Sequence, residues 1–163
     1  SVLTMIDLAG KIPDGRLIPL LAQIIEEPDV PEVEDKWGIF GSRGVMAASA
    51  LVNSPVPSAI PALLPAFSHV AADVRLRAVF AVVQLYSYRV DVRLKEAMAK
   101  ALDDNDLVVR RTAAKGMVLI EFPGAEEKLV AMSGAVALNE RLSAIYGLGA
   151  RHTTRIGVAC LSL

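Results

Sequence analysis

The sequence has few of the residues that build disulfides, metal centres or membrane spans. It contains one cysteine, Cys160, which excludes an internal disulfide and favours a reducing compartment. Its two histidines, His69 and His152, stand far apart and no Cys-x-x-Cys pair occurs, so we expect no metal centre and no cofactor. Because no apolar run reaches about 18 residues and no signal peptide is visible, we expect a cytoplasmic protein outside the membrane.

Aromatic residues are also scarce. They make up 5% of the 163 residues, whereas hydrophobic residues as a whole make up 53%. The interior must therefore be filled by Ala, Val, Leu and Ile, and these small side chains suit helices that pack closely. A β-sandwich would place more aromatic and β-branched residues in its strands. The composition favours an all-α fold.

Four arginines mark an internal repeat. The separations between them are 32, 35 and 31 residues, in the range of helical-hairpin repeats, and the arginines are Arg43, Arg75, Arg110 and Arg141. Residues three, four and seven positions after each arginine are apolar, which is the buried stripe of an amphipathic helix. The residue six positions after each arginine is small: Ser49, Ala81, Gly116 and Gly147. A mid-helix glycine such as Gly116 costs about 1 kcal/mol relative to alanine, so this column indicates close approach of a neighbouring helix.

The periodicity predicts four helical hairpins in one domain over 1–163. The units cover 16–52, 58–87, 91–121 and 125–150, and 151–163 is a cap or the start of a further unit. First helices are predicted at 16–27, 58–70, 91–102 and 125–133, and second helices at 37–52, 73–87, 106–121 and 138–150. We also expect a lone helix over 2–9, a kink at Pro65, and N-caps for the second helices from Ala72-Asp73, from 103–106 and from Asn139.

This pattern resembles HEAT repeats, particularly the short kind found in phycobilin lyase subunits. The resemblance is carried by Asp73-Val74-Arg75 with Ala78, Val79 and Leu85, by Val109-Arg110 with Ala113, Ala114 and Ile120, and more weakly by Glu140-Arg141 with Ala144, Ile145 and Leu148. It implies a right-handed α-solenoid of about four HEAT-like hairpins. The first unit departs from the pattern, because it carries ten extra residues and lacks the Asp-x-Arg turn.

The extra residues include the acidic segment "EEPDVPEVEDK", 26–36. Its charge and its two prolines are typical of a solvated surface insertion. It is also a candidate arm for gripping a basic partner. The repeated arginines have two interpretations as well: a ladder that binds phosphate or carboxylate ligands, or structural side chains that bond the preceding turn. The HEAT resemblance implies the structural role.

A candidate binding face lies on the second helices, away from the buried stripe. Positions two, five and nine after the arginines point to that face, which stacked hairpins use as a concave binding surface. The predicted partner-binding residues are Arg77, Phe80, Gln84, Thr112, Lys115 and Tyr146. Aromatic and cationic side chains are typical binding anchors, although Phe80 and Tyr146 could instead pack beneath neighbouring repeats.

No catalytic constellation is visible. The stretches "GIFGSRG" (38–44) and "GLGAR" (147–151) fit neither a phosphate loop nor a dinucleotide fingerprint, and 103–106 lacks the glycine and glutamate of a calcium loop. We therefore predict a non-catalytic scaffold module that binds a protein or peptide. The alternatives are a subunit of an enzyme, such as a chromophore lyase, or a nucleic-acid-binding solenoid. Residues 71–163 carry thirteen basic against ten acidic residues, but on the candidate binding face only Arg77 and Lys115 are cationic, so we expect weak nucleic-acid affinity.

Overall fold

The structure of the chain is a computed structural model, and it describes residues 2–28, 42–84, 91–117, 125–134, 141 and 144–145. The chain divides into two compact units, 1–85 and 86–163, which we describe separately. Every regular element in the described ranges is helical, without a β-strand. The predicted fold class, an all-α solenoid, is confirmed. The single domain over 1–163 stays a prediction.

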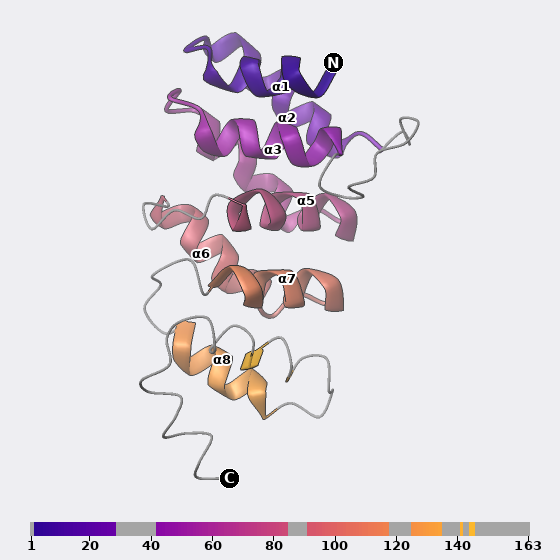
Figure 1. The fold of residues 1–163 in the computed structure, drawn as a ribbon, viewed down its shortest axis with the longest axis vertical. Coiled ribbons are helices and arrows are strands. Elements are labelled where there is room, and N and C mark those ends of the chain that lie inside the picture. Colours follow the sequence, from indigo (N-terminus) through magenta and orange to yellow (C-terminus); the bar gives the residue numbers. More distant parts are fainter. Residues whose placement is uncertain are drawn as a thin grey trace. The chain divides into compact units, whose positions relative to one another are not determined.

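The first unit begins with a lone helix and continues with helical hairpins (Figure 1). Its elements are α1 (Val2–Lys11), the 3-10 turn η1 (Gly15–Leu17), α2 (Ile18–Glu26), α3 (Arg43–Asn53), α4 (Ala59–Leu63), the 3-10 turn η3 (Leu64–Ser68) and α5 (Ala72–Val83). The second unit contains α6 (Val92–Ala101), α7 (Leu107–Met117) and α8 (Ala125–Ser133). The elements follow the predicted order of first and second helices. Of the last predicted helix, 138–150, only residues 141, 144 and 145 are described, and they are helical.

Proline and polar caps explain several helix boundaries. Pro19 occupies the first turn of α2, where its missing N–H would have no partner in any case. α4 ends at Leu63 and η3 begins at Leu64 with Pro65 in its first turn, so the predicted kink of this helix is confirmed. No helix in the described part of the chain is long and apolar enough to cross a membrane.

Among the second helices whose starts are described, α3, α5 and α7, two have a polar side chain as N-cap. The predicted cap Asn139 lies outside the described residues. Ser42 caps α3 by accepting a hydrogen bond from Val45 N at 3.1 Å. Asp106 caps α7, because its Oδ1 accepts bonds from the backbone N–H of Val108 at 2.8 Å and Val109 at 3.1 Å. The predicted cap at Ala72-Asp73 is wrong: both residues lie inside α5, which begins after Ala71 without a side-chain cap.

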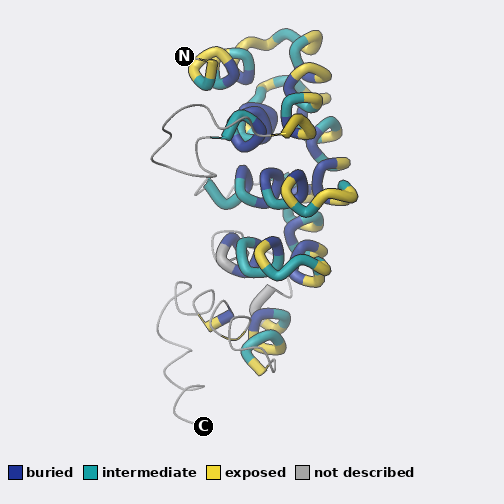
Figure 2. Tube along the Cα trace, turned by 90° about the vertical axis from the view of Figure 1, so that its right-hand side faces the viewer, coloured by how far each residue is buried: buried dark blue, intermediate teal, exposed yellow. Residues whose placement is uncertain are grey.

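The core of the first unit is centred on α3, which packs against α1 on one side and α5 on the other. Its buried residues are Gly44, Val45, Ala47, Ala48, Ala50 and Leu51. Figure 2 shows this concentration of buried residues in α3, whereas exposed residues recur along α1. A Cβ added at Gly10 of α1 would lie 2.6 Å from Ala50 Cβ and 2.7 Å from Ala50 Cα. A close helix contact at a glycine therefore occurs between α1 and α3, at residues outside the small-residue column, and the close contact predicted for that column stays a prediction.

In the second unit, α6 packs on α7 and buries Leu94 and Met98. Gly116 is buried in α7, as expected for a small residue at a close helix contact. A lysine connects α8 to the end of α6: Lys128 Nζ donates to Ala99 O at 3.2 Å and pairs with Asp103 Oδ2 at 2.5 Å. The Lys128 cation thus lies at a helix C-terminus, where unpaired carbonyls favour positive charge.

Candidate functional site

Two of the repeated arginines bond the turn that precedes their own helix. Arg75 Nη1 donates to His69 O at 2.8 Å and to Val70 O at 3.0 Å. Arg110 Nη1 donates to Asp104 O at 2.6 Å. In both repeats the acceptor lies six residues before the arginine, so the contact is the same local device. These contacts are those of a structural arginine that ties a second helix to its turn.

For the other two repeated arginines, the preceding turn lies outside the described residues. Arg43 begins α3 and is half-buried, and Arg141 is exposed. The carbonyls six residues before them belong to residues 37 and 135, which lie outside the described residues. Gly147, the last position of the small-residue column, also lies outside them. An anion-binding role for the four arginines together stays a prediction.

Arg77 is not on an exposed face, and the prediction that it is an accessible binding anchor is wrong. Its residue exposure is 5%. Its Nη1 donates to Ile25 O at 2.6 Å and to Glu27 O at 2.8 Å, where α2 ends. The helical spacing placed Arg77 away from the stripe of its own helix, but the carbonyls that hold it come from a segment about fifty residues earlier. The cation is buried because it is hydrogen-bonded there.

The remaining residues of the predicted face are only partly described. Phe80 and Gln84 are half-buried in and directly after α5, and Gln84 N donates to Phe80 O at 3.0 Å. Thr112 Oγ1 donates to Val108 O at 2.8 Å within α7. Tyr146 and the side chain of Lys115 lie outside the described residues. A binding role for Phe80, Gln84 and Thr112 stays a prediction.

The described ranges contain no visible cluster of catalytic or metal-binding side chains. No group of three or more His, Cys, Asp or Glu residues there is placed to hold a metal ion. The His69 ring lies at a turn, where its Nδ1 accepts a hydrogen bond from Ala71 N at 3.1 Å. His152 and Cys160 lie outside the described residues.

An Asp-x-Arg pair begins two first helices, and the sequence analysis missed it. Asp14 accepts bonds from the backbone N and guanidinium of Arg16, and Asp91 does the same with Arg93. The side-chain hydrogen bond from each arginine holds the pKa of its aspartate below the ordinary value of 3.8. The signal was available in "DGR" (14–16) and "DVR" (91–93), at the starts of two predicted first helices. We assigned Asp-x-Arg only to the turns of second helices.

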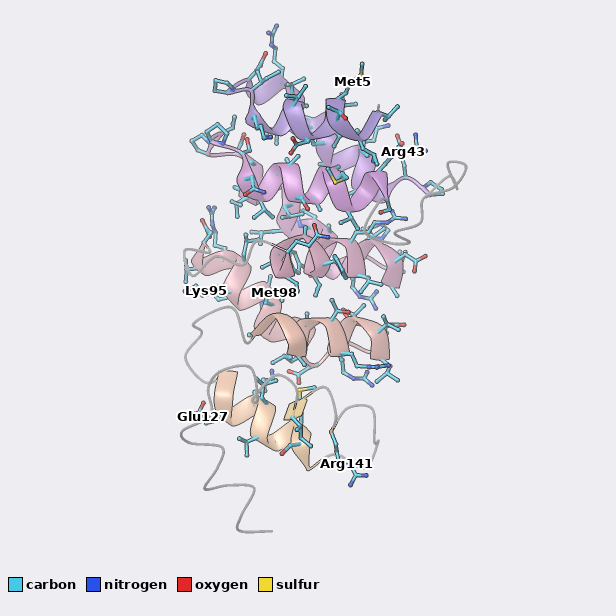
Figure 3. The ribbon with its side chains drawn as sticks, viewed as in Figure 1. Met5, Arg43, Lys95, Met98, Glu127 and Arg141 are labelled. Carbon is cyan, nitrogen blue, oxygen red and sulfur yellow. The ribbon has the colours of Figure 1, made fainter. Side chains whose placement is uncertain are left out.

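The structure reveals a surface that sequence spacing did not single out. Side chains three or four residues apart share one side of a helix, and four apolar ones of this spacing follow α1. We call them the α1 apolar face; their exposures are Val2 47%, Met5 71%, Leu8 53% and, directly after the helix, Ile12 49%. Figure 3 shows Met5 pointing away from α3. The other side of α1 holds Ile6 and Gly10, which are buried.

The Asp7–Lys11 ion pair, 2.6 Å between Oδ2 and Nζ, occupies a third side of α1. The α1 apolar face therefore contains no charged residue. Single exposed apolar residues are normal on protein surfaces, but a row of this kind is a candidate interaction site. The spacing of these four residues is visible in the sequence, but their exposure is not. Which side of α1 packs on α3 depends on the close contact at Gly10.

Comparison with known proteins shows the fold but not a family. No family model matches the chain, and no curated protein matches it. One similar solved structure is human deoxyhypusine hydroxylase in complex with glycerol, at 19% sequence identity and a TM-score of 0.59. The match covers 86% of this chain and 46% of that chain, so this chain spans about half the length of its neighbour. The likeness shows a HEAT-like all-helical fold.

The comparison also corrects the prediction that the chain is not an enzyme. The neighbour with the same fold is an enzyme. The prediction used the helical-repeat architecture as an argument for a scaffold, and that argument is wrong, because this architecture also occurs in an enzyme.

Proposed function

We propose that this chain is a helical-repeat component of an enzyme, and that it binds a helix of another polypeptide through the α1 apolar face. The observation that carries the binding part is the row of Val2, Met5, Leu8 and Ile12, each about half exposed or more. The likeness to deoxyhypusine hydroxylase supports the enzyme part through the fold.

The chemistry of the face favours a polypeptide helix as its ligand. In the first unit, α3 is a helix with neighbours on two sides, α1 and α5, and its apolar residues on both sides are buried. By contrast, α1 has apolar residues on two sides and described neighbours, α2 and α3, that leave the α1 apolar face exposed. An amphipathic helix laid along Met5, Leu8 and Ile12 would bury them as α1 buries part of α3. Small polar ligands would gain nothing from this surface.

Site-specific photo-crosslinking in the cells that naturally produce the protein tests the proposal. A photoreactive amino acid replaces Met5 or Ile12 in the intact chain, and Glu96 in the matched control, since Glu96 is exposed on α6. We expect Met5 and Ile12 to capture one common polypeptide and Glu96 to capture none. Leu8→Asp should lower that yield on the order of tenfold, because it places an unpaired charge in an apolar interface.

Equal capture from all three positions, or capture that survives Leu8→Asp, would contradict binding through the α1 apolar face. The enzyme part has its own readout. The captured polypeptide should be the catalytic chain of an enzyme or its protein substrate. A captured polypeptide that is neither would contradict the enzyme part of the proposal but still support binding through the α1 apolar face.

A chromophore lyase component is a narrower form of this proposal, favoured by the HEAT-like repeats around Arg75 and Arg110 together with the enzymatic neighbour. Co-expression with a phycobiliprotein and its tetrapyrrole tests it. Tetrapyrrole absorbance that forms on the phycobiliprotein only when this chain is present would support the lyase form, and unchanged absorbance would exclude it.

A further inference from the structure

One buried cation, Arg77, contacts the chain on both sides of residues 29–41. The described chain stops at Pro28 after α2 and resumes at Ser42 before α3. The Arg77 guanidinium, from α5, binds the carbonyls of Ile25 and Glu27 on the first side of this gap. On the second side, a Cβ added at Gly44 would lie 2.6 Å from Arg77 Cδ and 3.0 Å from its Nε.

We propose that Arg77 is the anchor that holds the end of α2 next to the start of α3, on the two sides of residues 29–41. Bringing the two sides together costs conformational entropy that grows with the number of residues between them, and the bonds of Arg77 offset this cost. The carbonyls at the end of α2 lack partners within the helix, so a guanidinium with five N–H donors is a suitable group to hold them. The partial negative charge at that helix end also favours the cation.

Gly44 is the second half of the anchor. It stands in the first turn of α3, where alanine would ordinarily improve helix stability. Here the methyl group of an alanine would overlap the Arg77 side chain, which cannot move without giving up its bonds to Ile25 O and Glu27 O. The absence of a side chain at Gly44 and the position of the Arg77 guanidinium therefore depend on each other. This explains how the first hairpin accepts ten extra residues between its helices.

The proposed anchor predicts that a substitution at the start of α3 changes the stability of the end of α2. Gly44→Ala should loosen the end of α2, although Gly44 is in α3, because the displaced guanidinium leaves the carbonyls of Ile25 and Glu27. Backbone amide exchange of the intact protein measures this. We expect Gly44→Ala and Arg77→Lys each to raise the exchange rate at Glu27 on the order of tenfold, as the loss of a charge-assisted hydrogen bond would. Gln84 N, bonded within α5, and Lys95 N, bonded to Asp91 O, are the reference amides.

A double-mutant cycle is the second readout. In the Arg77→Ala background the overlap is gone, so Gly44→Ala should no longer lower the unfolding midpoint. The matched control combines Gly44→Ala with Arg93→Ala, which removes an exposed arginine of the second unit, and there the two effects should add. Equal acceleration at Glu27 and Gln84, or additivity of Gly44→Ala with Arg77→Ala, would overturn the proposal.

Discussion

At Gly10 the absence of one methyl group decides whether α1 can pack on α3. A Cβ at this position would meet Ala50 Cβ at 2.6 Å, Ala50 Cα at 2.7 Å and Ala50 O at 2.8 Å. Two of these atoms belong to the backbone of α3, so no rotation of a side chain relieves the overlap. Overpacking costs about 1–3 kcal/mol, which exceeds the gain of up to about 1 kcal/mol from the better helix propensity of alanine.

We therefore expect Gly10→Ala to lower the free energy of unfolding, as measured by urea denaturation. Gly15→Ala is the matched control in the same unit, since a Cβ there would meet only Val56 Cγ1, at 3.8 Å. Ala50→Gly should not rescue Gly10→Ala, because the backbone atoms of residue 50 remain in place. If Gly10→Ala instead raised the free energy of unfolding, α1 and α3 could move apart without losing stability.

Arg77 shows where residue-scale prediction fails. Helical spacing gives the direction of a side chain on its own helix, and by that criterion Arg77 points away from the stripe. It cannot reveal that Ile25 O and Glu27 O lie where the guanidinium ends. A polar residue is buried or exposed according to partners that are distant in sequence, and only the tertiary structure supplies them.

At the scale of the helices, most of the fold followed from the sequence. Apolar periodicity, Pro65 and Asp106 are local signals, and the elements that they predicted are present. The first turn of α5 was misplaced because Asp73 looked like a cap, whereas the helix had already begun at Ala72. Which surface of α1 remains exposed could not be predicted, because it depends on how α1 and α3 pack.

The Asp-x-Arg caps give the first helices a pH-dependent contribution to stability. The bond from Arg93 holds the pKa of Asp91 below 3.8 in the folded state. A carboxylate whose pKa is lowered by folding stabilises the protein above its ordinary pKa, and this stabilisation is lost as the pH falls through the folded value. Asp91→Asn keeps an acceptor for the helix N-terminus but removes the charge.

We expect Asp91→Asn to be less stable than the natural protein at pH 6 and the difference to shrink as the pH falls below 3.8. The effect should be small, because the pair is partly exposed. Urea denaturation at both pH values measures it, with Glu96→Gln on the same helix as the control. A difference that grows on acidification would have the wrong sign for this mechanism.

At the scale of the whole molecule, charge distribution separates a protein partner from a nucleic acid. Binding to a phosphate backbone requires several cations that converge on it. Three exposed cations of the described chain, Lys11, Arg16 and Arg93, instead pair with carboxylates a few residues away. Arg77, which the sequence analysis counted among the accessible cations, is buried. The structure thus leaves fewer cations for phosphate than the sequence had indicated.

We expect only weak, nonspecific binding of DNA or RNA, even though residues 71–163 contain more basic than acidic residues. A fluorescence titration with a labelled duplex and a labelled single strand, at about 150 mM salt, measures the affinity under conditions where weak electrostatic binding is largely screened. Leu8→Asp is the informative variant: it should lower capture of the polypeptide partner on the order of tenfold and leave the weak nucleic-acid signal unchanged, since the α1 apolar face holds no cation. Submicromolar affinity that falls steeply with salt and is lost on Arg93→Glu would favour the nucleic-acid-binding solenoid instead. In that case a phosphate group would compete with Asp91 for the Arg93 guanidinium.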